Sequence, residues 1–180
     1  MLLRSGKAFD EIDKFITEAN KKYLKTNDER YHKVATFRIN TSGEIENLDQ
    51  FNGWNELAKK HPEVNFGIYT KNFDVVKEFL ETNENTADNF VVNISQWHHV
   101  ADEFLEKHQG KFNIFEYDDT NRTGNELSEE DIERLKNERH CPAVTPDGHH
   151  AFTKDGEPIT CDMCKRCYRK TGEITAVYAH

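Results

Sequence analysis

The chain has 180 residues, of which 24 are basic and 33 acidic, so its formal net charge is −9 at neutral pH. This length suits about one domain with its own core, and the acidic excess disfavours direct binding to nucleic acid. No apolar run approaches the roughly 18 residues of a membrane span, so we expect a soluble, cytoplasmic protein without a membrane partner.

The predicted elements begin with a helix and continue as alternating strands and helices. Apolar residues recur at helical spacing from Phe9 to Tyr23, which predicts an amphipathic helix over residues 6–25. Further along the chain, strands are predicted over 34–39, 64–70, 89–95, 111–117 and 174–178, and helices over 48–60, 73–81, 98–107 and 128–138. Alternation of this kind is typical of parallel sheets with right-handed crossovers. The expected fold is α/β, with an open, largely parallel sheet of four to five strands and flanking helices, similar to part of a barrel.

Polar residues stand where several of the predicted strands end. Ligand sites in parallel sheets gather at the carboxyl ends of the strands, so these side chains are candidates for one crevice that holds a small anion or a metal. The alternative is that they are polar because loops are solvated. No glycine-rich phosphate loop or nucleophile elbow is present, so we predict no catalytic residue and expect an inhibitor or binding protein rather than an enzyme. The crevice candidates are Arg38, Lys71, His98, Asp118 and Asp119.

The last forty residues differ in kind from the preceding part. Apolar periodicity stops near residue 140, and three of the four cysteines fall within "CDMCKRC". A segment of this composition does not bury enough apolar surface to order itself, so we expect a metal to order it. The chain is therefore divided into an α/β core over 1–139, with the N-terminal helix, and a metal-binding tail over 140–180 packed on the same domain. The expected ligands are Cys141, Cys161, Cys164 and Cys167.

Two metals suit four thiolates, and the spacing leaves both open. Zn²⁺ takes four cysteines tetrahedrally, usually as two C-x₂-C pairs. Three ligands in seven residues and a remote cysteine followed by proline (Cys141, Pro142) are closer to a [4Fe–4S] cluster. Either centre carries a net charge of about −2, which nearby cations would offset. Candidate groups around the ligands are His140, His149, His180, Lys165 and Arg166.

Several segments resemble the phage and plasmid "gene product 88" family. They are "FRINTSGE", "HPEVNFGIYTK", "CPA", "CDMCKRCY" and the closing "VYAH", and the similarity covers residues 34–180. The resemblance implies a mobile-element origin and a metal-bearing α/β fold. One departure is Glu44, where the family pattern has aspartate, and this weakens any catalytic role carried over to that position.

Phage origin, small size, acidity and the lack of a catalytic set favour an antagonist of host defence that acts in the host bacterial cytoplasm. Such a protein is similar in character to metal-containing anti-CRISPR proteins that inhibit Cas9-type effectors. These nucleases present basic channels for guide and target, so the expected partner is a basic host protein of this kind, a CRISPR effector nuclease. The alternative is an iron–sulfur redox or sulfur-handling enzyme that uses the strand-end crevice.

Overall fold

The chain divides into two compact units, each described by itself. The N-terminal unit holds residues 1–68 and 72–91, and the C-terminal unit holds 69–71 and 92–180. The predicted boundary at residue 139 lies inside the C-terminal unit and stays a prediction. The computed structural model describes residues 7–26, 33–40, 44–82, 85–95, 102–118, 139–143, 149, 151–172 and 174–178.

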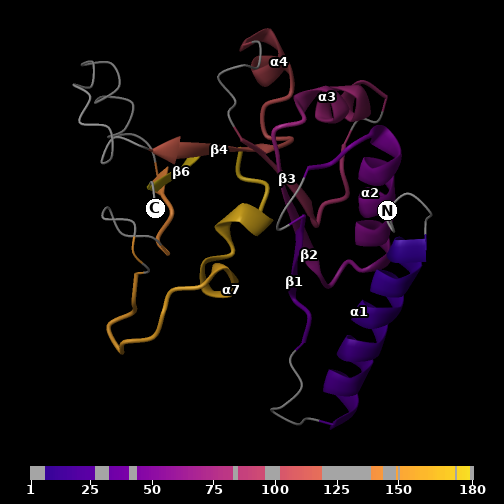
Figure 1. Cartoon of the computed structure of the whole chain (residues 1–180), viewed down its shortest axis with the longest axis vertical. Coiled ribbons are helices and arrows are strands. Elements are labelled where there is room, and N and C mark those ends of the chain that lie inside the picture. Colours follow the sequence, from indigo (N-terminus) through magenta and orange to yellow (C-terminus); the bar gives the residue numbers. More distant parts are fainter. Residues whose placement is uncertain are drawn as a thin grey trace. The chain divides into compact units, whose positions relative to one another are not determined.

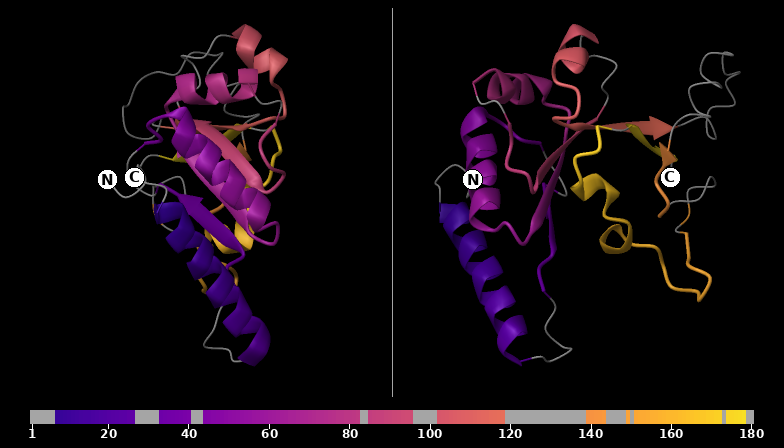
Figure 2. Two further views of the ribbon diagram at one scale, coloured as in Figure 1. Left: turned by 90° about the vertical axis from the view of Figure 1, so that its right-hand side faces the viewer. Right: turned by 180° about the vertical axis from the view of Figure 1, so that it is seen from behind.

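The N-terminal unit packs helices against a parallel strand pair. Strands β1 and β2 are parallel, with Phe37 opposite Phe66, and α1 and α2 lie along one side of them (Figures 1 and 2). Strand β2 passes into the C-terminal unit at residue 69, and strand β3 does so at residue 92. The elements are α1 (Lys7–Thr26), β1 (Thr36–Ile39), α2 (Leu48–Lys60), β2 (Asn65–Thr70), α3 (Phe73–Thr82) and the start of β3 (Phe90–Ser95).

The core of this unit is aromatic. Phe51 on α2 packs against Phe79 on α3 and Phe90 on β3, with ring centroids 4.6 and 5.2 Å apart, and all three side chains are fully buried. Helix α2 begins where Asn47 accepts a hydrogen bond from the backbone N–H of Gln50, a standard N-cap. Burial of each such ring contributes about 2–3 kcal/mol, so this cluster contributes substantially to the stability of the unit.

The C-terminal unit contains the remaining parallel ladder. Strand β3 pairs with β4, β4 with β6, and β6 with β5, all in parallel. A compact turn of α7 and a 3₁₀ helix precedes β6, and Figure 2 shows it in yellow. The elements are α4 (Asp102–Lys107), β4 (Asn113–Asp118), β5 (Arg139–His140), α7 (Cys161–Cys164), η3 (Arg166–Tyr168) and β6 (Ile174–Tyr178).

The expected α/β class with a parallel sheet and flanking helices is confirmed. Strand β4 begins two residues later than predicted, because the N–H of Lys111 donates to the carbonyl of His108 and closes a turn. The two-residue strand β5 was not predicted. The predicted helix over 128–138 lies outside the described residues. No described helix has the length and apolar character that would let it cross a membrane.

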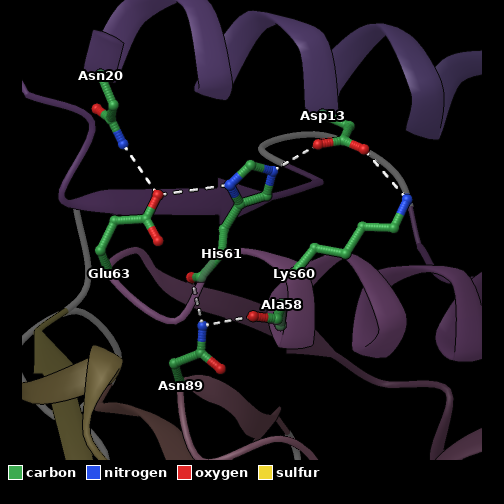
Figure 3. Close-up of polar contacts among 7 residues, drawn as sticks. All are labelled: Asp13, Asn20, Ala58, Lys60, His61, Glu63 and Asn89. Atoms are coloured by element: carbon green, nitrogen blue, oxygen red, sulfur yellow. Dashed lines mark hydrogen bonds and ion pairs between the residues drawn. The ribbon is translucent and has the colours of Figure 1, made fainter.

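A buried histidine joins α1 to the turn after α2 (Figure 3). The ring of His61 lies 2.8 Å from the Asp13 carboxylate and 3.4 Å from that of Glu63, and its side chain is 7% exposed. Lys60 contacts Asp13 at 3.1 Å, and Asn20 on α1 donates to Glu63 at 3.2 Å. The hydrogen bond from Lys60, aided by His61, holds the pKa of Asp13 below its ordinary value. This cluster therefore fastens α1 to α2 through both charge and hydrogen bonds.

The C-terminus of α2 is closed by one amide side chain. The Nδ2 group of Asn89 lies 2.9 Å from the carbonyls of Ala58 and His61 and 2.7 Å from that of Val64. Figure 3 shows the first two of these contacts. Ala58 lies in the last turn of α2, His61 is its C-cap and Val64 follows, so Asn89 joins the end of this helix and the turn after it to a distant part of the chain.

The Asp13 contacts predict a pH-dependent stability. Because the pKa of Asp13 is lowered in the folded state, its contribution is present above about pH 4 and is lost as the pH falls through the lowered value. We expect Asp13→Asn to reduce the free energy of unfolding by about 0.5–1 kcal/mol at neutral pH, and by much less near pH 3. Urea unfolding at the two pH values measures this. Asp10→Asn, an exposed change on the same helix, is the control. An equal loss at both pH values would contradict the expectation.

Candidate metal centre

The four cysteines belong to three local structures of the C-terminal unit. Cys141 directly follows β5, and its N–H donates to the carbonyl of Ala176 on β6 at 2.8 Å. Cys161 and Cys164 are the first and last residues of α7, and Cys167 lies within η3. The Cys161 side chain is exposed, whereas those of the other three are partly buried.

A ladder of backbone hydrogen bonds connects the surroundings of Cys141 and Cys161. The N–H of Ala151 donates to the carbonyl of Ala143 at 3.0 Å, and the N–H of Ile159 donates to that of Ala151 at 2.9 Å. Cys141 stands two residues before the first rung and Cys161 two residues after the last. The remote cysteine is thus tied back toward the other three by the chain itself.

The segment from Cys161 to Cys167 forms a knuckle with a left-handed residue at its centre. Thr160 caps α7 by accepting from the N–H of Met163, and Lys165 ends it with φ 55°, donating its N–H to the carbonyl of Cys161 at 2.7 Å. A left-handed conformation costs about 1 kcal/mol for a residue other than glycine, so the surrounding contacts must hold Lys165 there. The left-handed residue Lys165 therefore separates Cys164, at the end of α7, from Cys167 in η3 by a sharp backbone reversal.

Two buried asparagines hold this knuckle on the sheet. Asn93 on β3 and Asn113 on β4 stand opposite each other in register, and Asn113 donates to the Asn93 side-chain oxygen at 3.2 Å. Asn93 also donates to the carbonyl of Cys167 at 3.1 Å, and Asn113 to that of Arg169 at 2.8 Å. The Asn113 oxygen accepts from the N–H groups of Thr171 and Gly172 and from the Thr171 hydroxyl. The knuckle is therefore ordered by the sheet as well as by its own turns.

The other cysteines act electrostatically on the thiols of Cys141 and Cys167. Burial raises the pKa of the Cys167 thiol, a hydrogen bond with Tyr69 opposes the rise, and the other three thiols add to it. Burial likewise raises the pKa of Cys141, where the N–H of Ala143 and the charge of Arg166 oppose the rise. Thiols that repel one another as thiolates gain from a shared cation, which is the condition for a metal-thiolate site.

Over the part of the chain that the structure describes, no group of three or more His, Cys, Asp or Glu side chains is close enough to hold a metal ion as it stands. All four cysteines lie in the C-terminal unit, and thiolate sulfur is the type of donor that a soft cation prefers. The metal site accordingly stays a prediction.

Four of the five predicted surrounding groups lie among the described residues. Arg166 is the cation whose charge acts on Cys141, and its Nη1 atom lies 3.5 Å from the carbonyl of His140. Lys165 is the left-handed residue of the knuckle, and His149 is exposed. His180 lies outside the described residues.

The predicted crevice is not tested. Arg38 is exposed and belongs to the N-terminal unit, and Lys71 is exposed and belongs to the C-terminal unit. His98, Asp119 and the side chain of Asp118 lie outside what the structure describes. Sequence reasoning missed Tyr69, Asn93 and Asn113, which contact the knuckle directly; two asparagines inside apolar strands were the available signal.

These features define an α/β protein with a cysteine-rich knuckle anchored to its parallel sheet. The family model described as "Gene product 88" matches residues 1–170, so the chain belongs to this family. The match includes α1 and all four cysteines, and the name is a phage-type gene designation that supports the expected phage origin. No curated relative and no solved structure matches the chain.

The hydrogen bonds of Asn113 predict that a small change at this residue has a large effect on the free energy of unfolding. Asn113→Asp keeps the accepting oxygen but replaces the donating amide with an oxygen that faces the carbonyl of Arg169 and the oxygen of Asn93. We expect the free energy of unfolding to fall by about 2–3 kcal/mol, because the buried oxygen of Asn93 and the partly buried carbonyl of Arg169 lose their donor. Urea unfolding in the presence of a chelator measures this on metal-free protein. Thr171→Ala, which removes one 3.3 Å contact at an exposed side chain, is the control. A loss below about 0.5 kcal/mol in Asn113→Asp would contradict the anchor.

Proposed function

We propose that this chain is a phage metal-thiolate protein that antagonises host defence, most concretely an anti-CRISPR protein that binds a Cas9-type effector and blocks its binding or cleavage of DNA. The metal step, binding of a metal by the four cysteines, is supported by their presence in one unit, with Cys161, Cys164 and Cys167 within seven residues. The partner step, binding to a basic effector nuclease, is supported by the acidity of the chain. The two steps are separable and are tested separately.

The metal step assigns Cys141, Cys161, Cys164 and Cys167 as ligands. Zn²⁺ in this position would cross-link the end of β5 to the knuckle, over chain segments that otherwise rely on backbone hydrogen bonds. Four thiolates around Zn²⁺ leave a net charge of about −2. The guanidinium of Arg166, which already acts on Cys141, supplies a neighbouring positive charge.

The partner step rests on where the charge lies. The residues from Cys141 onward carry five basic and five acidic side chains, so the whole excess of nine negative charges precedes Cys141. Segments that repel phosphate backbones attract the basic channels of an RNA-guided nuclease. Complementary charge speeds encounter and makes the complex sensitive to salt. A protein docked in such a channel competes with DNA for the same surface.

Metal content is the first measurement. We expect about one zinc per chain in wild-type protein and in Met163→Ser, which changes an exposed residue between two ligands, and strong loss of zinc in Cys164→Ser. Elemental analysis and a visible spectrum, on protein purified with and without oxygen, give the answer. About four irons in a brown anaerobic sample would favour the iron–sulfur alternative instead. Absence of any bound metal under both conditions would remove the metal step.

Docking is tested with a guide-loaded Cas9-type effector. We expect a complex at about 50 mM salt that weakens markedly by about 300 mM, together with reduced cleavage of target DNA. Binding by calorimetry or interferometry and a cleavage assay over the same salt series measure both effects. Effector without this chain and effector with an unrelated protein of equal negative charge are the controls. A chain that neither binds at low salt nor changes cleavage is not an inhibitor of this effector class.

A further inference from the structure

Helix α1 leaves large apolar side chains exposed to solvent. Phe15 is 59% exposed, Leu24 79% and Tyr23 39%, and these are three of the five exposed large apolar side chains among the described residues. An amphipathic helix buries most of its apolar side chains against its own protein. Apolar side chains gathered on one exposed element indicate a surface that contacts another molecule.

The helix uses a different side to attach to its own unit. Phe9 packs edge-on against Trp54, with ring centroids 4.9 Å apart. Asp13 contacts His61 at 2.8 Å, and Ile16 is fully buried. Phe9, Asp13 and Ile16 are four and three residues apart, so they lie on one side of the helix. Figures 1 and 2 show α1, in indigo, extending past the end of α2.

Phe15 and Tyr23 lie on a second row of the helix. They are eight residues apart with Ala19 midway, and side chains four residues apart are neighbours on a helix surface. Because Ala19 is small, a side chain from another helix can approach closely between the two rings. Leu24 stands nine residues after Phe15, which is two and a half turns, so it lies on the opposite side of the helix from Phe15.

The charge of α1 reverses along its length. Residues 7–18 carry four acidic and two basic side chains, whereas residues 19–26 carry three basic side chains and no acidic one. These three, Lys21, Lys22 and Lys25, are all exposed. The helix dipole favours this distribution. A partner of one charge sign would match only half of the helix, whereas a second α1 that runs in the opposite direction matches both halves.

We propose that α1 is the interface of a homodimer, in which the α1 helices of two copies of this chain pack antiparallel. A two-fold axis near the middle of the pair places Phe15 of one copy against Ala19 of the other, and each contact occurs twice. Glu11 stands four residues before Phe15 and Lys22 seven residues after it, so both flank the apolar row. Glu11 of one copy then lies near Lys22 of the other.

The length of the helix sets the expected strength of this dimer. A helix of 20 residues is about 30 Å long, so a single helix pair gives an interface at the small end of specific complexes. We therefore expect a reversible dimer with a dissociation constant on the order of 10 μM. This inference depends on neither the metal step nor the partner step.

Sedimentation velocity over a series of protein concentrations measures the dissociation constant on the full chain. Reductant prevents disulfides through the exposed Cys161, and about 150 mM salt screens the repulsion between two chains of net charge −9. We expect Phe15→Ser to raise the constant at least about tenfold. Phe152→Ser is the matched control, because Phe152 is 61% exposed in the C-terminal unit, and we expect its constant to equal that of wild type.

An exchange of charges tests the direction of the two helices. Glu11→Lys and Lys22→Glu each bring like charges together in an antiparallel pair, so we expect each to raise the constant about fivefold. The double variant restores opposite charges, and we expect its constant to lie within about twofold of wild type. In a parallel pair each residue faces its own counterpart, so neither single change would weaken the dimer. Both residues are exposed, and circular dichroism checks that each variant is folded.

The outcomes bear on the dimer alone. A wild-type chain that remains a monomer up to about 500 μM overturns the inference. A dimer that Phe15→Ser leaves unchanged, or that Leu24→Ser weakens more strongly, uses another surface and also overturns it. Weakening by Phe15→Ser, together with rescue in the double charge variant, supports the antiparallel pair. Metal content and effector binding are separate measurements, so failure of this inference is distinguishable from failure of the proposed function.

Discussion

The pairing of Asn93 with Asn113 is the constraint on which the C-terminal unit depends. The two side chains are 1% and 3% exposed, and a buried amide without partners is costly. Asn113 forms hydrogen bonds with both of its N–H groups and with its oxygen. The free-energy cost of burying its amide is therefore offset only while the knuckle is in place. The sheet and the knuckle therefore stabilise each other, and neither is expected to keep its conformation alone.

Amide side chains that are buried or half-buried perform a similar task in the N-terminal unit. Asn89 closes the end of α2, Asn55 accepts from the N–H of Ala87, and Asn20 accepts from the N–H of Val34. Each joins backbone groups from segments far apart in the chain. An asparagine offers both a donor and an acceptor on a short side chain. It can therefore hydrogen-bond to loop backbone N–H and C=O groups that have no partner in a helix or sheet. The fold is thus specified by a few polar contacts in addition to its aromatic core.

Local sequence patterns predicted the elements but not what connects them. Helical spacing from Phe9 to Tyr23 and the run at residues 174–178 correspond to α1 and β6, because periodicity depends on near neighbours. The contacts that order the knuckle join residues 74 and 56 positions apart, from Asn93 to Cys167 and from Asn113 to Arg169. No window of the sequence contains both partners. The four cysteines were recognisable by spacing alone, whereas Tyr69 became visible only when β2 had been placed.

Anchoring by the sheet alters what the proposed metal would have to do in this protein. In a small zinc module the metal provides most of the folding free energy, because the chain without it is unordered. Here Asn93, Asn113 and the ladder through Ala151 already fix much of the segment that carries the ligands. These contacts order part of the segment without a metal, so the proposed metal would act mainly on the positions of the sulfurs. Such a centre would fix the local shape of a surface more than create the fold, which fits the proposed docking function.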